Sequence, residues 1–263
     1  MNLSLHNHNA LICGSSQGIG LAAAHEIAAM GARVTLLARN EEKLEKAAKE
    51  LPSPREQAHD YIVADFSQPE MVKVKVEEYL RTSGQAFHIL VNNTGGPPAG
   101  PVAGANVDEF LAAFHAHLIN NHTLALSVLP GMKEAGYGRI VNVISTSVKQ
   151  PLPNLGVSNT IRGAVANWAK TLANEVGRFN ITVNNVLPGA TATSRLDGII
   201  AGKAKKLGIS EEDAAASMLA EIPMQRFGEP AEIANAIAFL ASPAAGYING
   251  INLPVDGGRT ASL

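Results

Sequence analysis

Short apolar runs alternate with amphipathic stretches along most of the chain. In a parallel sheet both faces are covered by helices, so its strands are continuous apolar runs of about four to eight residues. Seven runs fit this description: residues 10–13, 34–37, 61–64, 88–91, 140–144, 181–187 and 251–253. Because helical stretches separate them, the pattern predicts an α/β fold: a doubly wound, seven-stranded parallel sheet, Rossmann-like, with helices on both faces.

Several residues mark the ends of the expected helices. Gly31 is expected to end the first helix, and Asn40 to cap the second. Ser67 with Glu70 forms a capping-box pattern, and Pro69 suits the start of a helix. Two ion pairs with i,i+4 spacing are expected on the solvated face of the second helix: Glu42 with Lys46, and Glu45 with Lys49.

The C-terminal third has a different organisation. Residues 194–222 predict a polar, helical insertion, which is followed by a helix from 230 to about 241 and by the last strand. The insertion is expected to cover the substrate. Because no internal repeat, low-complexity tract or linker interrupts the pattern, residues 1–263 are expected to form a single domain.

Composition narrows the class of protein. The 263 residues include 21 Lys+Arg and 23 Asp+Glu, a net charge of −2, and 46% are hydrophobic, as expected of a globular protein. Without a basic block, nucleic acid and an anionic membrane are not expected partners. The single cysteine, Cys13, excludes an intrachain disulfide and fits a cytoplasmic location. No export signal is visible, and no apolar run approaches the ~20 residues that span a bilayer.

A glycine-rich turn follows the first strand. It reads Gly14-Ser15-Ser16-Gln17-Gly18-Ile19-Gly20 and leads directly into an apolar helix. Glycines at such a turn allow a tight bend, close approach of a pyrophosphate to the backbone, and close packing of helix on strand. The turn therefore predicts a dinucleotide site formed by Gly14, Ser16, Gly18, Ile19 and Gly20, although turn geometry alone could also explain the glycines.

The residues after the second strand bear on the choice of dinucleotide. A site selective for NAD needs a carboxylate there to bind the ribose hydroxyls, and Ala38 is not one. The next residue, Arg39, can pair with a 2′-phosphate. We therefore expect a preference for NADP(H), with NAD(H) as the weaker cofactor; the alternative is that Arg39 is only a solvated side chain at a helix start.

Further motifs occur in order along the chain. They are Asp65 after the third strand, Asn92-Asn93-Thr94-Gly95 after the fourth, Gly138-Arg139-Ile140-Val141-Asn142 before the fifth, Pro188-Gly189 and Thr193 after the sixth, and Tyr247-Ile248-Asn249-Gly250 with Asp256-Gly257-Gly258 near the end. With the G-x-x-x-G-x-G spacing of the glycine turn, this set resembles the short-chain dehydrogenase/reductase family, and within it the 3-oxoacyl-ACP-reductase-like members. The resemblance runs from about residue 9 to residue 258.

The resemblance implies positions for a bound cofactor. Asp65, followed by Phe66, would lie at the adenine, and Asn92 and Gly95 would pass close to the adenosine and its ribose. Pro188, Gly189 and Thr193 would lie at the nicotinamide end. The alternative for Asp65 and Asn92 is that they only cap loops. The loop 95–101, rich in glycine and proline, is expected to form one wall of the site; the alternative is a loop with a structural role only.

The catalytic residues that the resemblance implies are mostly replaced. Family members use a Ser, a Tyr, a Lys four residues after the Tyr, and an Asn from the preceding helix. Ser145 keeps the serine, but Ser158 and Arg162 occupy the Tyr and Lys positions and His117 occupies the Asn position. The family's Y-x-x-x-K is therefore S-x-x-x-R. A serine hydroxyl is a much weaker acid than a phenol, and an arginine does not release its proton near neutral pH.

Other residues could supply the proton. Lys149, four residues after Ser145, and His117 are the candidates; the alternatives are a solvated lysine and a packed histidine. Arg162 could hold ribose hydroxyls or stabilise an oxyanion. The histidines near His117 are not paired with cysteines or carboxylates at metal-ligand spacing, so no metal is expected.

The sequence thus predicts an NADP(H)-dependent oxidoreductase that transfers a hydride to a carbonyl or related group of a small-molecule substrate. Two other classes remain open: a cofactor-binding sensor or assembly subunit without turnover, and a non-redox lyase or isomerase on the same fold. A homo-oligomer, by resemblance a tetramer, is also expected. Its second basis is the apolar C-terminal run that spans residues 236–240, 247–248 and 251–253.

Overall fold

The computed structural model describes residues 1–262 and contains the expected parallel sheet. Its strands are β1 (Asn9–Cys13), β2 (Arg33–Ala38), β3 (Asp60–Val63), β4 (Ile89–Asn92), β5 (Gly138–Val143), β6 (Ile181–Pro188) and β7 (Asn252–Val255). They pair in the order β3-β2-β1-β4-β5-β6-β7, and each pair is parallel. The predicted seven-stranded, doubly wound fold class is confirmed, with strand ends that differ by one or two residues.

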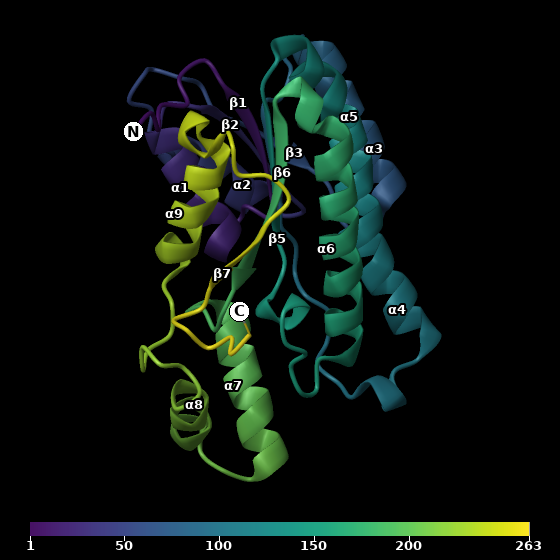
Figure 1. The fold of residues 1–263 in the computed structure, drawn as a ribbon, viewed down its shortest axis with the longest axis vertical. Helices are drawn as coiled ribbons and strands as arrows, with labels where there is room; N and C mark the ends of the chain where they lie inside the picture. The colour runs from purple at the N-terminus through teal and green to yellow at the C-terminus, as the bar shows by residue number, and fades with distance from the viewer. Residues whose placement is uncertain (263) are drawn as a thin grey trace.

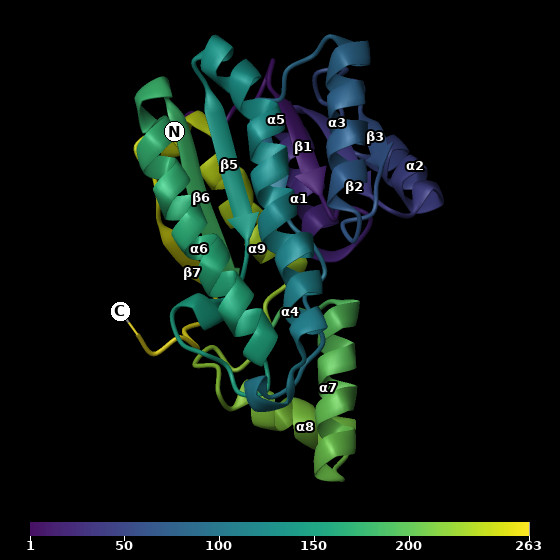
Figure 2. The ribbon, with the colours of Figure 1, turned by 90° about the vertical axis from the view of Figure 1, so that its right-hand side faces the viewer.

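Helices cover both faces of this sheet (Figures 1 and 2). They are α1 (Gly18–Ala29), α2 (Glu41–Glu50), α3 (Pro69–Ser83), α4 (Val107–Phe114), α5 (Asn120–Ala135), α6 (Gly156–Val176), α7 (Ser194–Leu207), α8 (Glu211–Leu219) and α9 (Pro230–Ala241). Buried residues of α1, α2 and α9 form one core with one face of the strands, and those of α3, α5 and α6 form the other. Side chains along β1 alternate between the two, since Ile12 belongs to the first and Leu11 to the second.

The expected helix ends were partly right. The Asn40 side chain accepts a hydrogen bond from Lys43 N (2.9 Å), and Lys49 lies 2.7 Å from Glu45, as predicted. Lys46, however, lies 3.9 Å from Glu50 instead of pairing with Glu42.

The capping box at Ser67 was wrong. The helix α3 begins at Pro69, as expected, but Gln68 precedes it without a side-chain cap. The backbone N–H of Ser67 instead donates to the carboxylate of Asp65 (2.9 Å). The Asp65 side chain therefore organises this turn, and it does so before the helix begins.

The insertion lies beyond the carboxyl ends of the strands. Helices α7 and α8 form this part, at the bottom of the view in Figure 1. The helix predicted for 230–241 is α9, which packs on α1. Its apolar residues Ile233, Ile237 and Leu240 are buried there, so this part of the apolar C-terminal run packs inside the core of one chain. Residues 236–240 therefore do not supply the exposed apolar surface that was one basis for expecting a homo-oligomer. Within residues 1–262, no helix has the length and apolar character needed to cross a membrane.

Candidate active site

Two glycines of the turn, Gly14 and Gly20, are packed so closely that a side chain would not fit. Gly14 has a φ of +58°, and a Cβ on it would lie 2.7 Å from the amide of Asn93. A Cβ on Gly20 would collide with the Gly14 carbonyl. The Asn93 side chain donates to the carbonyls of Cys13 and Gly14, both at 3.3 Å. These hydrogen bonds hold the turn against the segment after β4. The backbone of the turn lies at the amino end of α1, and the amino ends of helices favour the binding of phosphates.

The other residues of the turn have different surroundings. Ser15 is fully buried; its hydroxyl donates to Ile12 O (2.8 Å) and accepts from Leu37 N (3.0 Å). Ser16 and Ile19, expected in the cofactor site, are half-buried. Ile19 also packs against the core beneath α1.

Two cations lie on the side where the resemblance places the adenosine. Arg39 is exposed directly after β2. The pKa of Asp65 is lowered mainly by the backbone N–H of Ser67, with a smaller effect of the Arg39 charge. Lys43, in the first turn of α2, donates from Nζ to the Gln17 side chain (3.2 Å) and so reaches the glycine turn. Lys43 was not among the predicted site residues, although its position three residues after the helix cap Asn40 could have identified it.

The remaining residues assigned to the adenosine side are more enclosed. Asn92 is buried, and its amide donates to the Asn142 side chain (2.9 Å), which directs it into the sheet. Phe66 is buried and its carbonyl accepts from Asn120 (2.7 Å). Gly95, in contrast, has open space where a side chain would be.

The segment after β6 lies against the glycine turn. Gly189 N donates to Val255 O (3.0 Å), and a Cβ on Gly189 would lie 2.7 Å from the backbone of Asp256. Pro188 ends β6 and is half-buried. The methyl group of Thr193 lies 3.5 Å from the place a Gly18 Cβ would occupy. The expected nicotinamide residues and the phosphate turn are thus neighbours.

The positions of the altered catalytic residues converge near the end of β5. Ser145 follows this strand, and its Oγ accepts a hydrogen bond from Ser147 N (3.1 Å), so its hydroxyl hydrogen can point toward a ligand. Ser158 and Arg162 are both buried on α6, one turn apart. Arg162 donates from Nη1 to Val143 O (2.8 Å). The arginine therefore lies beside the strand end that carries Ser145.

A second arginine reaches this region from α7. Arg195 is the second residue of that helix and donates to the carbonyls of Gly96 (3.1 Å) and Pro97 (3.3 Å). A Cβ on Gly96 would lie 2.5 Å from its guanidinium. The loop is also held on its far side, where Gly100 N donates to Asn154 O (2.7 Å). The sequence reasoning did not select Arg195, although its place two residues after Thr193 was available.

His117 lies within electrostatic range of these two arginines. It lies in a π-helical turn, His115–Ile119, that interrupts the helix between α4 and α5; such turns are frequent at functional sites. The side chain is 3% exposed. Burial, and then the charges of Arg162 and Arg195, lower the pKa of His117 to about 2. The imidazole is therefore neutral at physiological pH, which disfavours His117 among the predicted sources of the proton.

Arg162 keeps its charge in the same surroundings. Burial, and then the charge of Arg195, lower its pKa to about 10, still well above neutrality. Its Nε is buried without a hydrogen-bond partner. Lys149, the other proposed proton source, is half-buried directly after the turn Thr146–Val148, and its backbone N–H donates to Thr146 O (2.9 Å).

The four tyrosines lie on other elements. Tyr61 belongs to β3 and Tyr79 to α3. The hydroxyl of Tyr137, just before β5, donates to Ala241 O (2.7 Å), and Tyr247 is fully exposed. No tyrosine is therefore part of α6. Within residues 1–262, no group of three or more His, Cys, Asp or Glu side chains could hold a metal ion.

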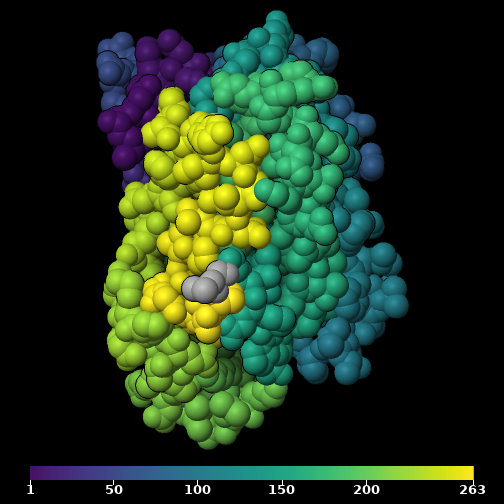
Figure 3. Space-filling view, viewed as in Figure 1, coloured from purple at the N-terminus to yellow at the C-terminus, as the bar shows by residue number. Residues whose placement is uncertain are grey.

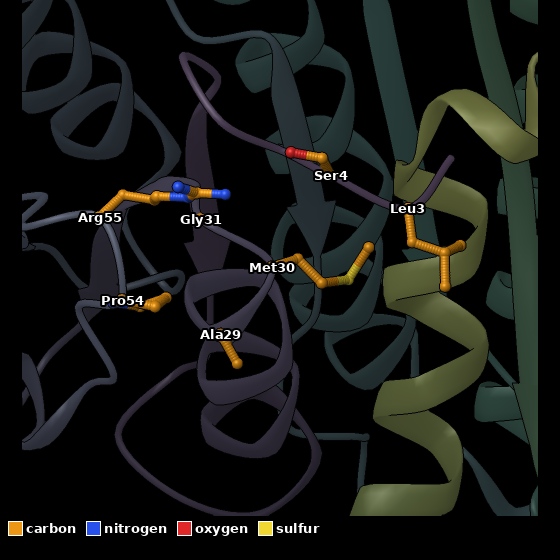
Figure 4. Close-up of a pocket in the computed structure, with 7 residues that line it drawn as sticks. All are labelled: Leu3, Ser4, Ala29, Met30, Gly31, Pro54 and Arg55. Carbon is orange, nitrogen blue, oxygen red and sulfur yellow. The ribbon is translucent and has the colours of Figure 1, made fainter. Parts of the chain in front are cut away.

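A cavity of about 470 Å³ lies elsewhere. It is lined by the N-terminal segment, the end of α1 and the loop after α2, and Figure 4 shows its residues: Leu3, Ser4, Ala29, Met30, Gly31, Pro54 and Arg55. The end of α1 is next to the amino end of β2. Ligands of open α/β sheets bind at the carboxyl ends of the strands, so this cavity is not the candidate site.

Comparison with known proteins identifies relatives over the whole chain. Residues 14–260 match a family model described as enoyl-(acyl carrier protein) reductase. The 3-oxoacyl-[acyl-carrier-protein] reductase FabG of Pseudomonas aeruginosa is 33% identical over 262 residues, 99% of this chain and 100% of that protein. The NADPH-dependent reductase BacG of Bacillus subtilis is 27% identical, over 98% of this chain and 100% of that protein.

A solved structure has the same fold. The L-sorbose reductase of Gluconobacter frateurii, in complex with NADPH and L-sorbose, superimposes with a TM-score of 0.93 and 33% identity over 100% of both chains. Since the family model and the relatives extend over nearly all residues, including the glycine turn and the end of β5, this chain belongs to the short-chain dehydrogenase/reductase family.

Proposed function

We propose that this protein is an NADP(H)-dependent oxidoreductase that transfers a hydride to a carbonyl or related group, with an altered catalytic set. The observation that carries the proposal is the glycine turn itself: Gly14 and Gly20 have no room for side chains, and Thr193 lies beside Gly18. A dinucleotide whose phosphates lie at this turn would extend toward Ser145. The similarity to BacG and to the NADPH-bound L-sorbose reductase supports the same cofactor.

The cations after β2 favour the phosphorylated dinucleotide. Arg39 and Lys43 are both near the start of α2, and Lys43 already contacts Gln17 of the glycine turn. The 2′-phosphate of NADP(H) would offer them a charge-assisted hydrogen bond that NAD(H) lacks. No carboxylate at position 38 competes for the ribose.

The reaction would use this chain's residues to hold the developing charge. When bound, NADPH would supply a hydride to the carbonyl carbon, and the carbonyl oxygen would become an alkoxide that must be protonated. Ser145 can donate a hydrogen bond to that oxygen, and the permanent charge of Arg162 can stabilise it. We propose Lys149 or water as the source of the proton, since Ser158 is too weak an acid and His117 is neutral.

A second candidate is a cofactor-binding protein without turnover. It is favoured by the neutral state of His117 together with the absence of tyrosine from α6. NADPH binding, followed by its fluorescence, and NADPH oxidation, followed by its absorbance against a panel of carbonyl compounds, separate the two. Binding with no oxidation of NADPH by any compound supports this second candidate and contradicts the first.

Rebuilding the usual pair provides a second comparison. Ser158→Tyr with Arg162→Lys restores Y-x-x-x-K in place of S-x-x-x-R. If the parent oxidises NADPH and the double variant is slower, the altered residues form a catalytic site of their own. If only the double variant reduces a simple ketone, the parent does not catalyse ordinary carbonyl reduction.

A further inference from the structure

The two arginines of the site lack carboxylate partners. Arg162 and Arg195 are close enough that the charge of Arg195 lowers the pKa of Arg162, and both lower that of His117. Among residues 1–262, no ion pair joins either arginine to an acidic side chain. The group at the end of β5 therefore consists of two cations and a neutral imidazole, and no acidic side chain of residues 1–262 forms an ion pair with either cation.

Such an arrangement is costly unless a ligand completes it. Arg162 is 8% exposed, its Nη1 is bound to a neutral carbonyl, and its Nε has no partner. A buried charge without a counter-charge costs several kcal/mol, and a neutral hydroxyl satisfies its hydrogen bonds but not its charge. An anionic ligand would remove this cost and also occupy the unpaired donor.

The pyrophosphate of the cofactor is an insufficient counter-charge for Arg162. It is expected at the amino end of α1, after β1, whereas Arg162 is bonded to the end of β5. The strand β4 lies between β1 and β5, so the two strand ends are separated by about 10 Å. Arg162 is thus nearer to Ser145 than to the phosphates.

Arg195 contributes the second guanidinium. It crosses from α7 to the loop 95–101, where it uses two of its donors on the carbonyls of Gly96 and Pro97. A guanidinium has five N–H donors in a planar fork, which leaves donors of both arginines for a planar anion. The side chain also connects the helical insertion to the wall of the site.

We propose that the substrate carries a carboxylate, bound by Arg162 and Arg195 while Ser145 holds the reacting oxygen. This inference rests on the proposed function, because it places the substrate beside the nicotinamide residues. The carboxylate lies a few carbons from the reacting carbon, since Arg162 contacts the strand end two residues before Ser145. The substrate class is therefore an oxo acid or an unsaturated acid.

Pairs of matched compounds test the proposal. Oxo acids with one to three carbons between the two groups are compared with their methyl esters, first as ligands of the NADPH-bound protein by quenching of NADPH fluorescence, then as substrates. At least one acid should bind at least tenfold more tightly than its ester. Equal binding of each acid and its ester, or binding of no acid, overturns the proposal.

A variant of Arg195 tests whether this arginine binds the acid. Arg195→Gln changes an exposed side chain and should raise the Kd of the acid at least tenfold without changing that of the ester or of NADPH. Arg81→Gln, on an exposed arginine of α3, is the matched control and should change none of them. If Arg195→Gln weakens NADPH but not the acid, Arg195 binds the cofactor and the proposal is wrong.

The loop offers a test that leaves both arginines in place. Gly96→Ala would displace the Arg195 guanidinium and should weaken the acid several-fold. Gly100→Ala, in the same loop with nothing near the new methyl group, should not. Equal effects of the two substitutions contradict the role of Arg195.

Failure of this inference and failure of the proposed function give different results. If acids bind through Arg195 but no compound oxidises NADPH, the carboxylate site stands and the oxidoreductase proposal fails. If neutral ketones are reduced without any preference for acids, the oxidoreductase proposal stands and the carboxylate site is contradicted.

Discussion

At the scale of single residues, charge at the start of α2 is expected to decide the cofactor. Arg39→Ala should weaken NADPH binding by about 1.5–3 kcal/mol, because a charge-assisted pair with the 2′-phosphate is lost. NADH binding should remain nearly unchanged. Isothermal titration calorimetry with both cofactors measures the difference, and Lys46→Ala, on the exposed face of α2, serves as the control. Equal weakening of both cofactors would reject the phosphate role.

His117 makes a prediction about stability. Its pKa is about 2 in the folded protein and near 6.5 in an unfolded chain, so between these values the unfolded chain holds one more proton. Stability from this group is complete above about pH 6.5 and falls as the pH decreases, by up to about 1.4 kcal/mol per pH unit.

His117→Asn removes the titrating group. Urea unfolding at pH 7.5, 6.0 and 5.0 should therefore show a shallower loss of stability with acid in this variant than in the parent. Leu118→Met, on the same π-helical turn, controls for altered packing and should keep the parent's slope. A variant with the same slope as the parent would show that folding does not lower the pKa of His117.

At the scale of elements, the connection from β1 to α1 depends on absent side chains. Gly20→Ala places a methyl group against the Gly14 carbonyl and should weaken NADPH binding at least tenfold, about 1.4 kcal/mol or more. Gly163→Ala, in α6 with nothing near the new methyl group, should instead raise stability by about 0.5–1 kcal/mol through helix propensity. Titration with NADPH and urea unfolding of both variants test this contrast.

A row of asparagines crosses four strands of the sheet. Asn92, Asn142, Asn185 and Asn252 occupy paired positions on β4 to β7, and the amides of the first three each donate to the next side chain at 2.8–2.9 Å. Since the first three are buried, each depends on its neighbours for hydrogen bonds. The row therefore fixes the register of β4 to β7 beneath α5 and α6.

Breaking this row in the middle should be more costly than at its end. Asn142→Ala leaves a donor on Asn92 and an acceptor on Asn185 unpaired, which should cost about 2–5 kcal/mol of unfolding free energy. Asn252→Ala, at the half-buried end of the row, should cost only about 0.5–1.5 kcal/mol. Urea denaturation of both variants checks the order, and similar losses would contradict a cooperative row.

At the scale of the whole molecule, we predict a homo-oligomer, by family resemblance a tetramer. The edge strand β7 is half-buried and Tyr247 is fully exposed, and Figure 3 shows the yellow C-terminal part of the chain on the visible surface. An unpaired edge strand tends to be covered by a partner. Light scattering in dilute solution should give a mass above 27.5 kDa, and a monomer would contradict the prediction.

The sequence alone determined the fold class, and it predicted most residues of the candidate cofactor site. Hydrophobic runs separated by helical periods determine a parallel sheet, because each strand must bury both faces. The glycine turn, Arg39 and Asp65 are local signals, since each follows a strand end at a fixed place. The Asn40 cap was also readable, because a cap involves only the next few residues.

Only the tertiary structure decided what surrounds these residues. Arg195, 33 positions after Arg162, and His117, 45 positions before it, come within electrostatic range of Arg162 only through the fold. Likewise Asp65 accepts a hydrogen bond in the turn before α3, where a Ser67 cap was predicted, and α9 buries its apolar residues on α1. Burial and charge depend on neighbours that are distant in sequence, so the neutral state of His117 and the unpaired charge of Arg162 follow from the fold and not from residue type.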